Sequence, residues 1–285
     1  MRQVVRRPRP AAVPWALQRP EWVTRELGDP TGRGVRVGVL DSGWDRSLRD
    51  PRVLPGVGLT DPANELALGR TDDDADRNGH GTACADQVLR IAPDARVVPV
   101  RVFGRGLDTS PSVLYEALKW AVEQRLHVIN VSLGTSLHET MYPLYVLCER
   151  ARRSGIIVVA AGHNQQDWSY PAIFENVIGV DAAQFDSPFT YRYRPDEAME
   201  CLAWGLDVPV RWLGGRHVPR TGTSFAAPQI SGMVALFRER YPDATLEDVR
   251  ELLARYAEGV DHGTTPVDAD SRSDGDPTAP DEPSA

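Results

Sequence analysis

The chain has 285 residues, of which 41% are hydrophobic and 25% are charged, and its formal net charge is -8. This length and apolar content allow one large α/β domain or two small ones, and they exclude disorder along the whole chain. The acidic charge argues against nucleic-acid binding, and no apolar run approaches the roughly eighteen residues that cross a membrane. We therefore expect a globular protein with neither a nucleic acid nor a membrane as its partner.

Charge is unevenly distributed between the two ends of the chain. The first ten residues hold four arginines and no acidic residue, whereas residues 261–285 hold seven acidic residues and one arginine. From Gly259 onward the chain is rich in Asp, Pro, Ser, Thr and Gly, and it has too few large apolar residues to offset the entropy of ordering it. The composition predicts a basic arm over residues 1–10, one domain over 11–258 and an acidic disordered tail over 259–285.

The cysteines and the N-terminal sequence bear on the compartment. Cys84, Cys148 and Cys201 are too few, and odd in number, for a disulfide framework, which favours a reducing compartment. Residues 1–30 lack the continuous apolar core of a secretory signal. We therefore expect a cytoplasmic protein, and the sequence leaves its oligomeric state open.

Apolar runs alternate with helical patterns along the predicted domain. Five runs rich in valine and isoleucine are typical of strands buried on both faces of a parallel sheet: Val35–Leu40, Arg96–Phe103, Val128–Leu133, Ile156–Ala161 and Val177–Asp181. Segments with an apolar stripe at helical spacing are Ser112–Leu126, Pro143–Ser154 and Thr245–Tyr256. The alternation predicts one α/β domain, in which ligands bind at the carboxyl ends of the strands.

The first predicted strand ends in VGVLDSG, which places Asp41 at its carboxyl end. An acid at this position is compatible with a capping residue, a metal ligand, a ribose acceptor or a member of a catalytic triad. Capping is the commonest of these roles, so the motif alone does not decide between them.

A histidine flanked by glycines follows in DRNGHGTACA. Gly79 and Gly81 let the backbone around His80 approach a neighbouring element closely, and a helical pattern follows. A lone histidine is usually structural or solvated, but the flanking glycines remove neighbours that would bury the ring and so favour a catalytic role.

A serine opens the apolar helix of RTGTSFAAPQISGMVALF. Ser224 is compatible with a simple N-cap, yet a hydroxyl at a helix N-terminus also lies where free N–H groups stabilise a developing anion. Pro228 is expected within the first turn, where a proline is tolerated.

Asp41, His80 and Ser224 follow one another in one of the known triad orders, the order of subtilisin. The sequence resembles the subtilisin-like serine proteases across nearly the whole predicted domain. VPWAL resembles the start of the mature catalytic domain, and VGVLDSG, NGHGTACA and GTSFAAP resemble the aspartate, histidine and serine motifs. VINVSLG and the segment from YPA to VIGVDA match further framework segments. The resemblance implies an α/β, subtilisin-like three-layer domain with a mainly parallel central sheet covered by helices on both faces.

The resemblance also implies roles for individual residues. Ser224 would be the nucleophile, His80 its general base and then acid, and Asp41 the group that orients the imidazole. The family has VVAAAGN before its oxyanion asparagine, and the ungapped segment here is VVAAGHN, so Asn164 would form the oxyanion hole with the backbone N–H of Ser224.

The same comparison implies a pocket for the residue before the cut bond. Its two walls would be Ser132, Leu133 and Gly134 on one side and Ala161, Gly162 and His163 on the other. Gly162 and His163 replace the alanine and glycine that are usual in the family. If the side chain of His163 points inward, the pocket disfavours large aromatic residues; an outward orientation stays equally open.

No metal site is assigned from the sequence, and no cofactor is expected to be required. Asp72, Asp73, Asp74 and Asp76 are interpreted as a solvated loop, with calcium binding possible but unassigned. Cys84 lies one helical turn after His80 and is expected to be a buried packing residue.

The leading hypothesis is a serine endopeptidase that cuts a peptide or protein substrate through an acyl-enzyme on Ser224. Only about ten residues precede VPWAL, where secreted relatives carry a signal and a folded pro-domain, so the chain is either a mature fragment or an intracellular enzyme that folds without a pro-domain. Met1 and the unpaired cysteines favour the intracellular enzyme, and a small domain without a pro-domain fits a precursor-processing role. The basic arm is a candidate regulatory strap, and the acidic body favours cationic or neutral peptides. The alternative is a non-catalytic peptide- or protein-binding relative, whereas dinucleotide binding fails for want of GxGxxG after the first strand.

Overall fold

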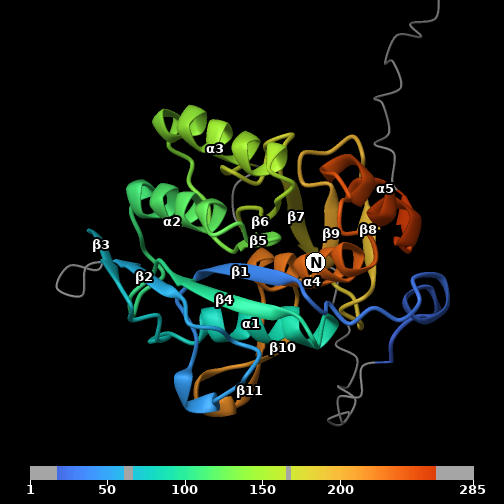
Figure 1. The fold of residues 1–285 in the computed structure, drawn as a ribbon, viewed down its shortest axis with the longest axis horizontal. Coiled ribbons are helices and arrows are strands. Elements are labelled where there is room, and N and C mark those ends of the chain that lie inside the picture. Colours follow the sequence, from blue (N-terminus) through green and yellow to red (C-terminus); the bar gives the residue numbers. More distant parts are fainter. Residues whose placement is uncertain (1–17, 61–66, 165–167, 261–285) are drawn as a thin grey trace, which may run out of the picture.

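A ten-stranded sheet runs through the centre of the molecule (Figure 1). The computed structural model describes residues 18–60, 67–164 and 168–260. From one edge to the other the strands are β12 (Gly259–Val260), β8 (Tyr191–Tyr193), β9 (Cys201–Trp204), β7 (Ile178–Ala183), β6 (Ile157–Ala161), β5 (Val128–Val131), β1 (Arg36–Asp41), β4 (Arg96–Arg101), β2 (Val57–Thr60) and β3 (Leu68–Thr71). Neighbouring strands are parallel except at β2–β3 and β8–β9.

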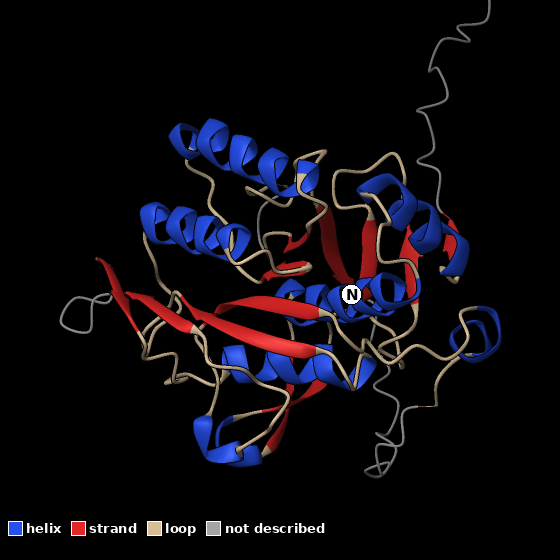
Figure 2. Ribbon diagram, viewed as in Figure 1, coloured by secondary structure: helices blue, strands red, loops and turns tan. Residues whose placement is uncertain are grey.

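Helices cover both faces of this sheet (Figure 2). On one face lie α1 (His80–Ile91), α4 (Thr223–Arg240) and α5 (Leu246–Tyr256); on the other lie α2 (Pro111–Glu123) and α3 (Met141–Arg153). Side chains along β1 point alternately to the two faces of the sheet. Val37 and Val39 pack in the core under α1, α4 and α5, and Leu40 packs in the core under α2 and α3. The expected three-layer α/β architecture is confirmed.

The five predicted strands correspond to β1, β4, β5, β6 and β7, and the three predicted helices to α2, α3 and α5. Thr245 caps α5 as expected: its hydroxyl accepts from the Asp248 N–H, and the Asp248 carboxylate accepts from the Thr245 N–H at 2.8 Å. The short strands β2, β3 and β8 to β12 are not predicted from the sequence. They owe their order to pairing with neighbours and not to strong periodicity of their own.

The predicted basic arm, residues 1–10, and the predicted acidic tail, residues 259–285, lie outside the described residues, apart from Gly259 and Val260. Gly259 and Val260 belong to the sheet as β12, where they pair in parallel with Arg192 and Tyr193. The ordered domain therefore continues two residues beyond the boundary that composition predicts.

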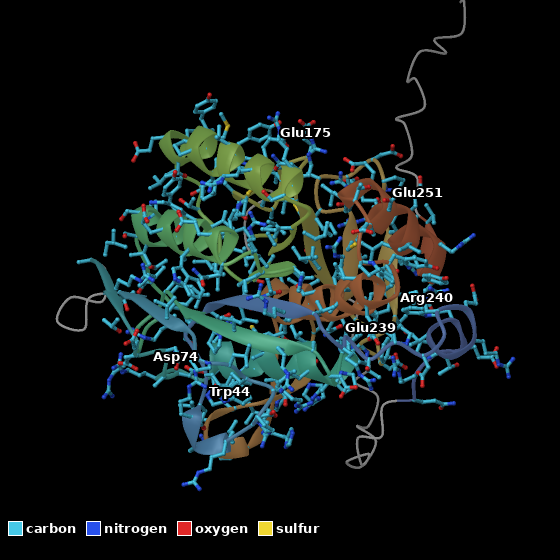
Figure 3. All side chains as sticks on the ribbon, in the orientation of Figure 1. Trp44, Asp74, Glu175, Glu239, Arg240 and Glu251 are labelled. Atoms are coloured by element: carbon cyan, nitrogen blue, oxygen red, sulfur yellow. The ribbon has the colours of Figure 1, made fainter. Side chains whose placement is uncertain are left out.

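A carboxylate at the end of α4 connects that helix to the loop before β1. Glu239, labelled in Figure 3, accepts backbone N–H bonds from Thr31 at 2.6 Å and from Arg33 at 2.9 Å, and also from the intervening Gly32. Three consecutive N–H groups that converge on one carboxylate oxygen form an anion-binding turn. The contact holds the start of β1 against the helix that carries Ser224.

The strand order reverses direction around β1. From β1 the chain passes through β2, β3 and α1 to β4 on one side of β1, and then through α2 on the opposite face to β5 on the other side. A crevice forms at the carboxyl ends of strands where such a switch occurs. Asp41, the last residue of β1, lies at this edge.

Candidate active site

Asp41, His80 and Ser224 come together at the carboxyl edge of the sheet. Asp41 ends β1, His80 begins α1, and Ser224 is the second residue of α4. The Nδ1 atom of His80 lies 2.8 and 2.9 Å from the two Asp41 carboxylate oxygens, and its Nε2 lies 2.8 Å from Ser224 Oγ. All three side chains are buried. This hydrogen-bonded chain fits an Asp–His–Ser triad.

The glycines on either side of His80 are required by close packing. Gly79 has φ 109°, and a Cβ there would lie 2.3 Å from the Trp212 ring. A Cβ at Gly81 would lie 2.4 Å from the Gly43 carbonyl oxygen in the loop after β1. The expectation that these glycines allow close approach is confirmed, and the contact brings His80 to the end of β1.

Asp76 organises the loop before His80, a role that the sequence analysis missed. Its Oδ1 accepts from the backbone N–H of Asn78 at 2.8 Å and of Gly79 at 2.7 Å, and its Oδ2 accepts from the Thr82 N–H at 2.9 Å. Ser42, next to Asp41, donates its hydroxyl to Asp76 at 2.9 Å. An Asp followed two residues later by Asn-Gly is a signal for such an Asx turn.

The acidic run before His80 does not fit a calcium cradle. Asp73 accepts from Arg77, Asp74 is buried and accepts from Arg46 and from the Gly56 N–H, and Asp76 is surrounded by N–H and O–H donors. Calcium requires oxygen ligands free to converge on it, whereas these oxygens already face donors and cations. Only Asp72 is exposed, so the interpretation of the run as a solvated loop is wrong for Asp74.

Opposing electrostatic effects act on His80. Burial lowers the pKa of the ring, but the charge of Asp41 and its hydrogen bond raise it, and the net pKa lies above the ordinary histidine value. Burial and the same aspartate raise the pKa of Cys84, so its thiol stays protonated. Its Sγ donates to the Ser224 carbonyl oxygen at 3.2 Å.

Asn164 is oriented by the first residue of α4. Its Oδ1 accepts from the Thr223 backbone N–H at 2.9 Å, which leaves Nδ2 without a partner among residues 18–60, 67–164 and 168–260. A Cβ at Gly222 would lie 3.3 Å from Ser224 Oγ and 3.5 Å from Asn164 Oδ1, so both side chains border the same glycine. The arrangement offers an N–H donor beside the serine hydroxyl.

A hollow of about 370 Å³ adjoins Ser224. All six residues predicted for the pocket walls line it, namely Ser132, Leu133, Gly134, Ala161, Gly162 and His163. His163 is exposed at this surface. Phe103, Leu107, Asp108 and Thr109 form a further part of the lining that the sequence analysis missed. These four follow β4, whose carboxyl end opens beside that of β1.

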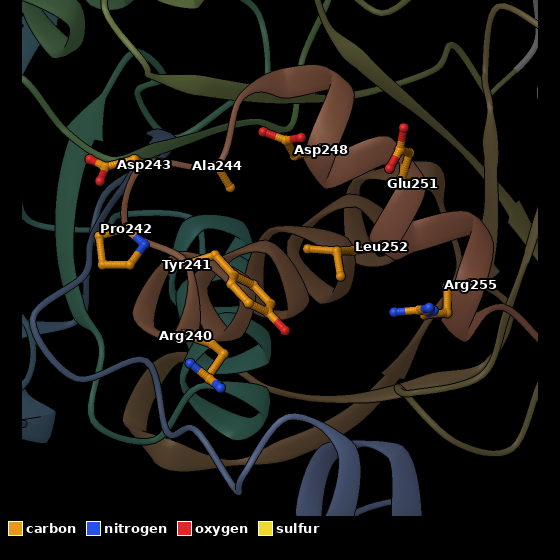
Figure 4. A pocket seen from close by; sticks show the side chains of 9 residues that line it. All are labelled: Arg240, Tyr241, Pro242, Asp243, Ala244, Asp248, Glu251, Leu252 and Arg255. Atoms are coloured by element: carbon orange, nitrogen blue, oxygen red, sulfur yellow. The ribbon is translucent and has the colours of Figure 1, made fainter.

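A second hollow, of about 750 Å³, lies at the far end of α4 (Figure 4). Arg240 and Arg255 border it together with Asp243 and Glu251. It contains no member of the Asp–His–Ser arrangement. The chemistry described above therefore belongs to the smaller hollow at the strand ends.

Comparison with known proteins agrees with this geometry. A model of the subtilase family matches residues 32–279. The chain belongs to the subtilase family. It is 31% identical over 239 residues to the thermostable alkaline protease of Halalkalibacterium halodurans, which covers 79% of this chain and 63% of that protein. It is 29% identical over 226 residues to an intracellular serine protease of Paenibacillus polymyxa, which covers 73% of this chain and 68% of that one.

Solved structures show the same fold for this subtilase. A cold-adapted subtilisin-like serine proteinase superposes with a TM-score of 0.65 over 80% of this chain and 83% of the other, at 22% identity. Among residues 18–60, 67–164 and 168–260, no helix combines the length and the apolar character that crossing a membrane requires.

Proposed function

We propose that this subtilase is a serine endopeptidase that hydrolyses peptide bonds through an acyl-enzyme on Ser224. The observation that carries the proposal is the hydrogen-bonded chain from Ser224 Oγ through His80 to the buried Asp41. A serine hydroxyl becomes an effective nucleophile when a base lies within hydrogen-bond reach. A peptide or protein is the proposed substrate.

In the proposed mechanism each step uses a particular atom. Ser224 Oγ attacks the substrate carbonyl carbon while its proton moves to His80 Nε2, and Asp41 stabilises the imidazolium at Nδ1. Asn164 Nδ2 and the Ser224 backbone N–H, which lies in the first turn of α4 without an intrahelical acceptor, stabilise the oxyanion. His80 then protonates the leaving amine, and water releases the acyl group by the same steps.

The competing proposal is a non-catalytic relative that binds peptides in the same hollow. Such a protein has no need for a base aligned on a hydroxyl or for a neighbouring amide donor that no described residue engages. This subtilase retains both, which favours the enzyme.

A fluorophosphonate probe tests the activity. We expect covalent labelling of the wild type, no labelling of Ser224→Ala, and hydrolysis of internally quenched peptides by the wild type alone. Removal of the nucleophile costs about a million-fold in subtilisin, so the contrast is large. Wild-type protein that is folded by circular dichroism and yet unlabelled would establish the binding role instead.

A reducing, cytoplasmic compartment and a restricted processing role complete the proposal. Cys84, Cys148 and Cys201 are all buried and unpaired, which supports a reducing compartment, as does the likeness to an intracellular protease. We propose that residues 1–10 form a regulatory arm and that an acidic tail follows the domain. Deletion of residues 2–10 is expected to change activity or stability, and no change would refute a regulatory arm.

A further inference from the structure

The proposed mechanism fixes the side of His80 on which the departing half of the substrate lies. His80 Nε2 protonates the leaving amine, so the residues after the cut bond pass next to this ring. The hollow formed by Ser132–Gly134 and Ala161–Asn164 receives the residues before the cut. The surface beside His80 and away from these walls therefore meets the leaving peptide.

A two-stranded hairpin reaches the residue before His80 and contributes no residue to the lining of that hollow. It consists of β10 (Val208–Arg211) and β11 (His217–Arg220), which pair antiparallel. Trp212 follows β10, and its ring packs directly against Gly79, the residue before His80. Arg220 ends β11 four residues before Ser224.

Arg220 is held over the Trp212 ring. Its guanidinium carbon lies 4.4 Å from the ring centroid, a cation–π distance. Trp212 in turn packs against Gly79, the residue before His80, so the guanidinium lies on the side of the proposed site that carries the histidine. Electrostatics agrees with this placement: Arg220 lowers the pKa of His80, a smaller effect than that of burial, which also lowers it, or of Asp41, which raises it.

No described residue neutralises the charge of Arg220. The side chain is exposed and donates to the Pro219 carbonyl oxygen at 3.4 Å, and no carboxylate pairs with it in the part of the chain that the structure describes. Arg211 of the same hairpin differs, because Asp86 lies 3.9 Å from it. A fixed and unpaired guanidinium attracts carboxylates.

We propose that Arg220 makes this enzyme select acidic residues immediately after the cut bond. The proposal rests on the endopeptidase activity proposed above and names a feature of its substrate. It reverses, for this one subsite, the preference for cationic or neutral peptides that the overall acidic charge predicts.

Acyl transfer to added amines tests the subsite separately from peptide hydrolysis. An ester substrate forms the acyl-enzyme, and the α-amides of aspartate, alanine and lysine then compete with water for it. The attacking amine forms a bond to the acyl carbon, the bond to Ser224 Oγ breaks, and His80 accepts the amine proton and returns it to the serine. The ratio of products reports binding on the leaving side alone.

We expect the wild type to prefer the aspartate amide over the lysine amide by about three- to five-fold at low salt, as for an exposed ion pair. Arg220→Ala should remove the preference and Arg220→Glu should reverse it. The matched control is Arg216→Glu, because Arg216 is exposed in the turn between β10 and β11, at the opposite end of β11 from Arg220. It should retain the wild-type preference.

The outcomes separate the two proposals. Ester turnover without discrimination between aspartate and lysine amides would overturn the role of Arg220 and leave the endopeptidase intact. Equal effects of Arg216→Glu and Arg220→Glu would also overturn it, since the preference would then be a long-range effect of charge. Absence of ester turnover that depends on Ser224 would overturn the endopeptidase itself.

Discussion

Pro228 frees the backbone carbonyl of Ser224 from the hydrogen-bonding of α4. It lies four residues after Ser224 and has no N–H to donate to that oxygen. The oxygen accepts instead from Cys84 Sγ at 3.2 Å and Ser132 Oγ at 3.4 Å. Pro228 is the sixth residue of α4 and not in its first turn, as the sequence analysis expected. Because of the proline, Cys84 on α1 and Ser132, directly after β5, can bind the backbone carbonyl of the proposed nucleophile.

Cys84→Ala tests whether that thiol only supports the structure. Because the raised pKa keeps Cys84 protonated, we expect kcat/KM to stay within about threefold while the free energy of unfolding falls by about 1 kcal/mol. Peptide hydrolysis and urea denaturation measure the two effects. Loss of activity as large as that of Ser224→Ala would make Cys84 part of the chemistry.

Asp41→Asn should lower kcat by about 10⁴-fold and change its pH dependence. His80 must be neutral to act as a base, and its raised pKa places the acid limb of wild-type activity above the ordinary histidine value. Without the carboxylate, burial dominates and the limb moves to lower pH. Arg220→Ala removes a charge that lowers the pKa of His80 and should move the limb the opposite way. Two shifts in the same direction would contradict this account.

Asn164→Ala should reduce kcat by about 100- to 1000-fold, the cost of a comparable donor in subtilisin, with KM little changed. The amide is oriented by Thr223, and its Nδ2, which no residue in the described part of the chain engages, can meet an oxyanion that exists only in the transition state. Steady-state kinetics on one peptide separates the two constants. A large rise in KM with unchanged kcat would indicate a residue that merely binds substrate.

His163→Gly should widen the pocket for the residue before the cut. We predict that the wild type disfavours Phe and Tyr there and that the variant raises kcat/KM for a Phe substrate by about tenfold. His163 lines the hollow next to Ser224, which makes it the candidate for this selectivity. A peptide-library profile of the wild type dominated by Phe and Tyr would refute the prediction.

Glu239→Gln should lower the free energy of unfolding by about 2 kcal/mol, because three backbone N–H groups lose a charged acceptor. Activity below the unfolding temperature should be unchanged. Glu251→Gln is the matched control, since Glu251 is exposed, and it should stay within about 0.5 kcal/mol of the wild type. Equal effects of the two variants in urea denaturation would contradict the role of the Thr31–Arg33 turn.

Local patterns in the sequence were sufficient to predict the central strands and the triad candidates of this protein. The apolar runs that became β1 and β4 to β7 lie at the centre of the sheet, where burial on both faces demands continuous hydrophobicity. The motifs around Asp41, His80 and Ser224 could be recognised because each surrounds its residue with neighbours that the local geometry requires, as Gly79 and Gly81 do around His80.

Contacts between residues distant in the chain decided which charged side chains are buried, which residues line the hollow and where the hairpin packs. No local pattern reveals that Asp74 is buried against Arg46, or that Phe103 and Thr109 border the hollow beside Ser224. No motif in the sequence marks Trp212 or Arg220, and the role proposed for them depends on the packing of the hairpin against Gly79. The sequence by itself determined the family, the architecture and the triad candidates, because short motifs encode them. Tertiary structure alone decided which charges are neutralised and which face the substrate, because ion pairing and burial depend on where the fold brings distant side chains.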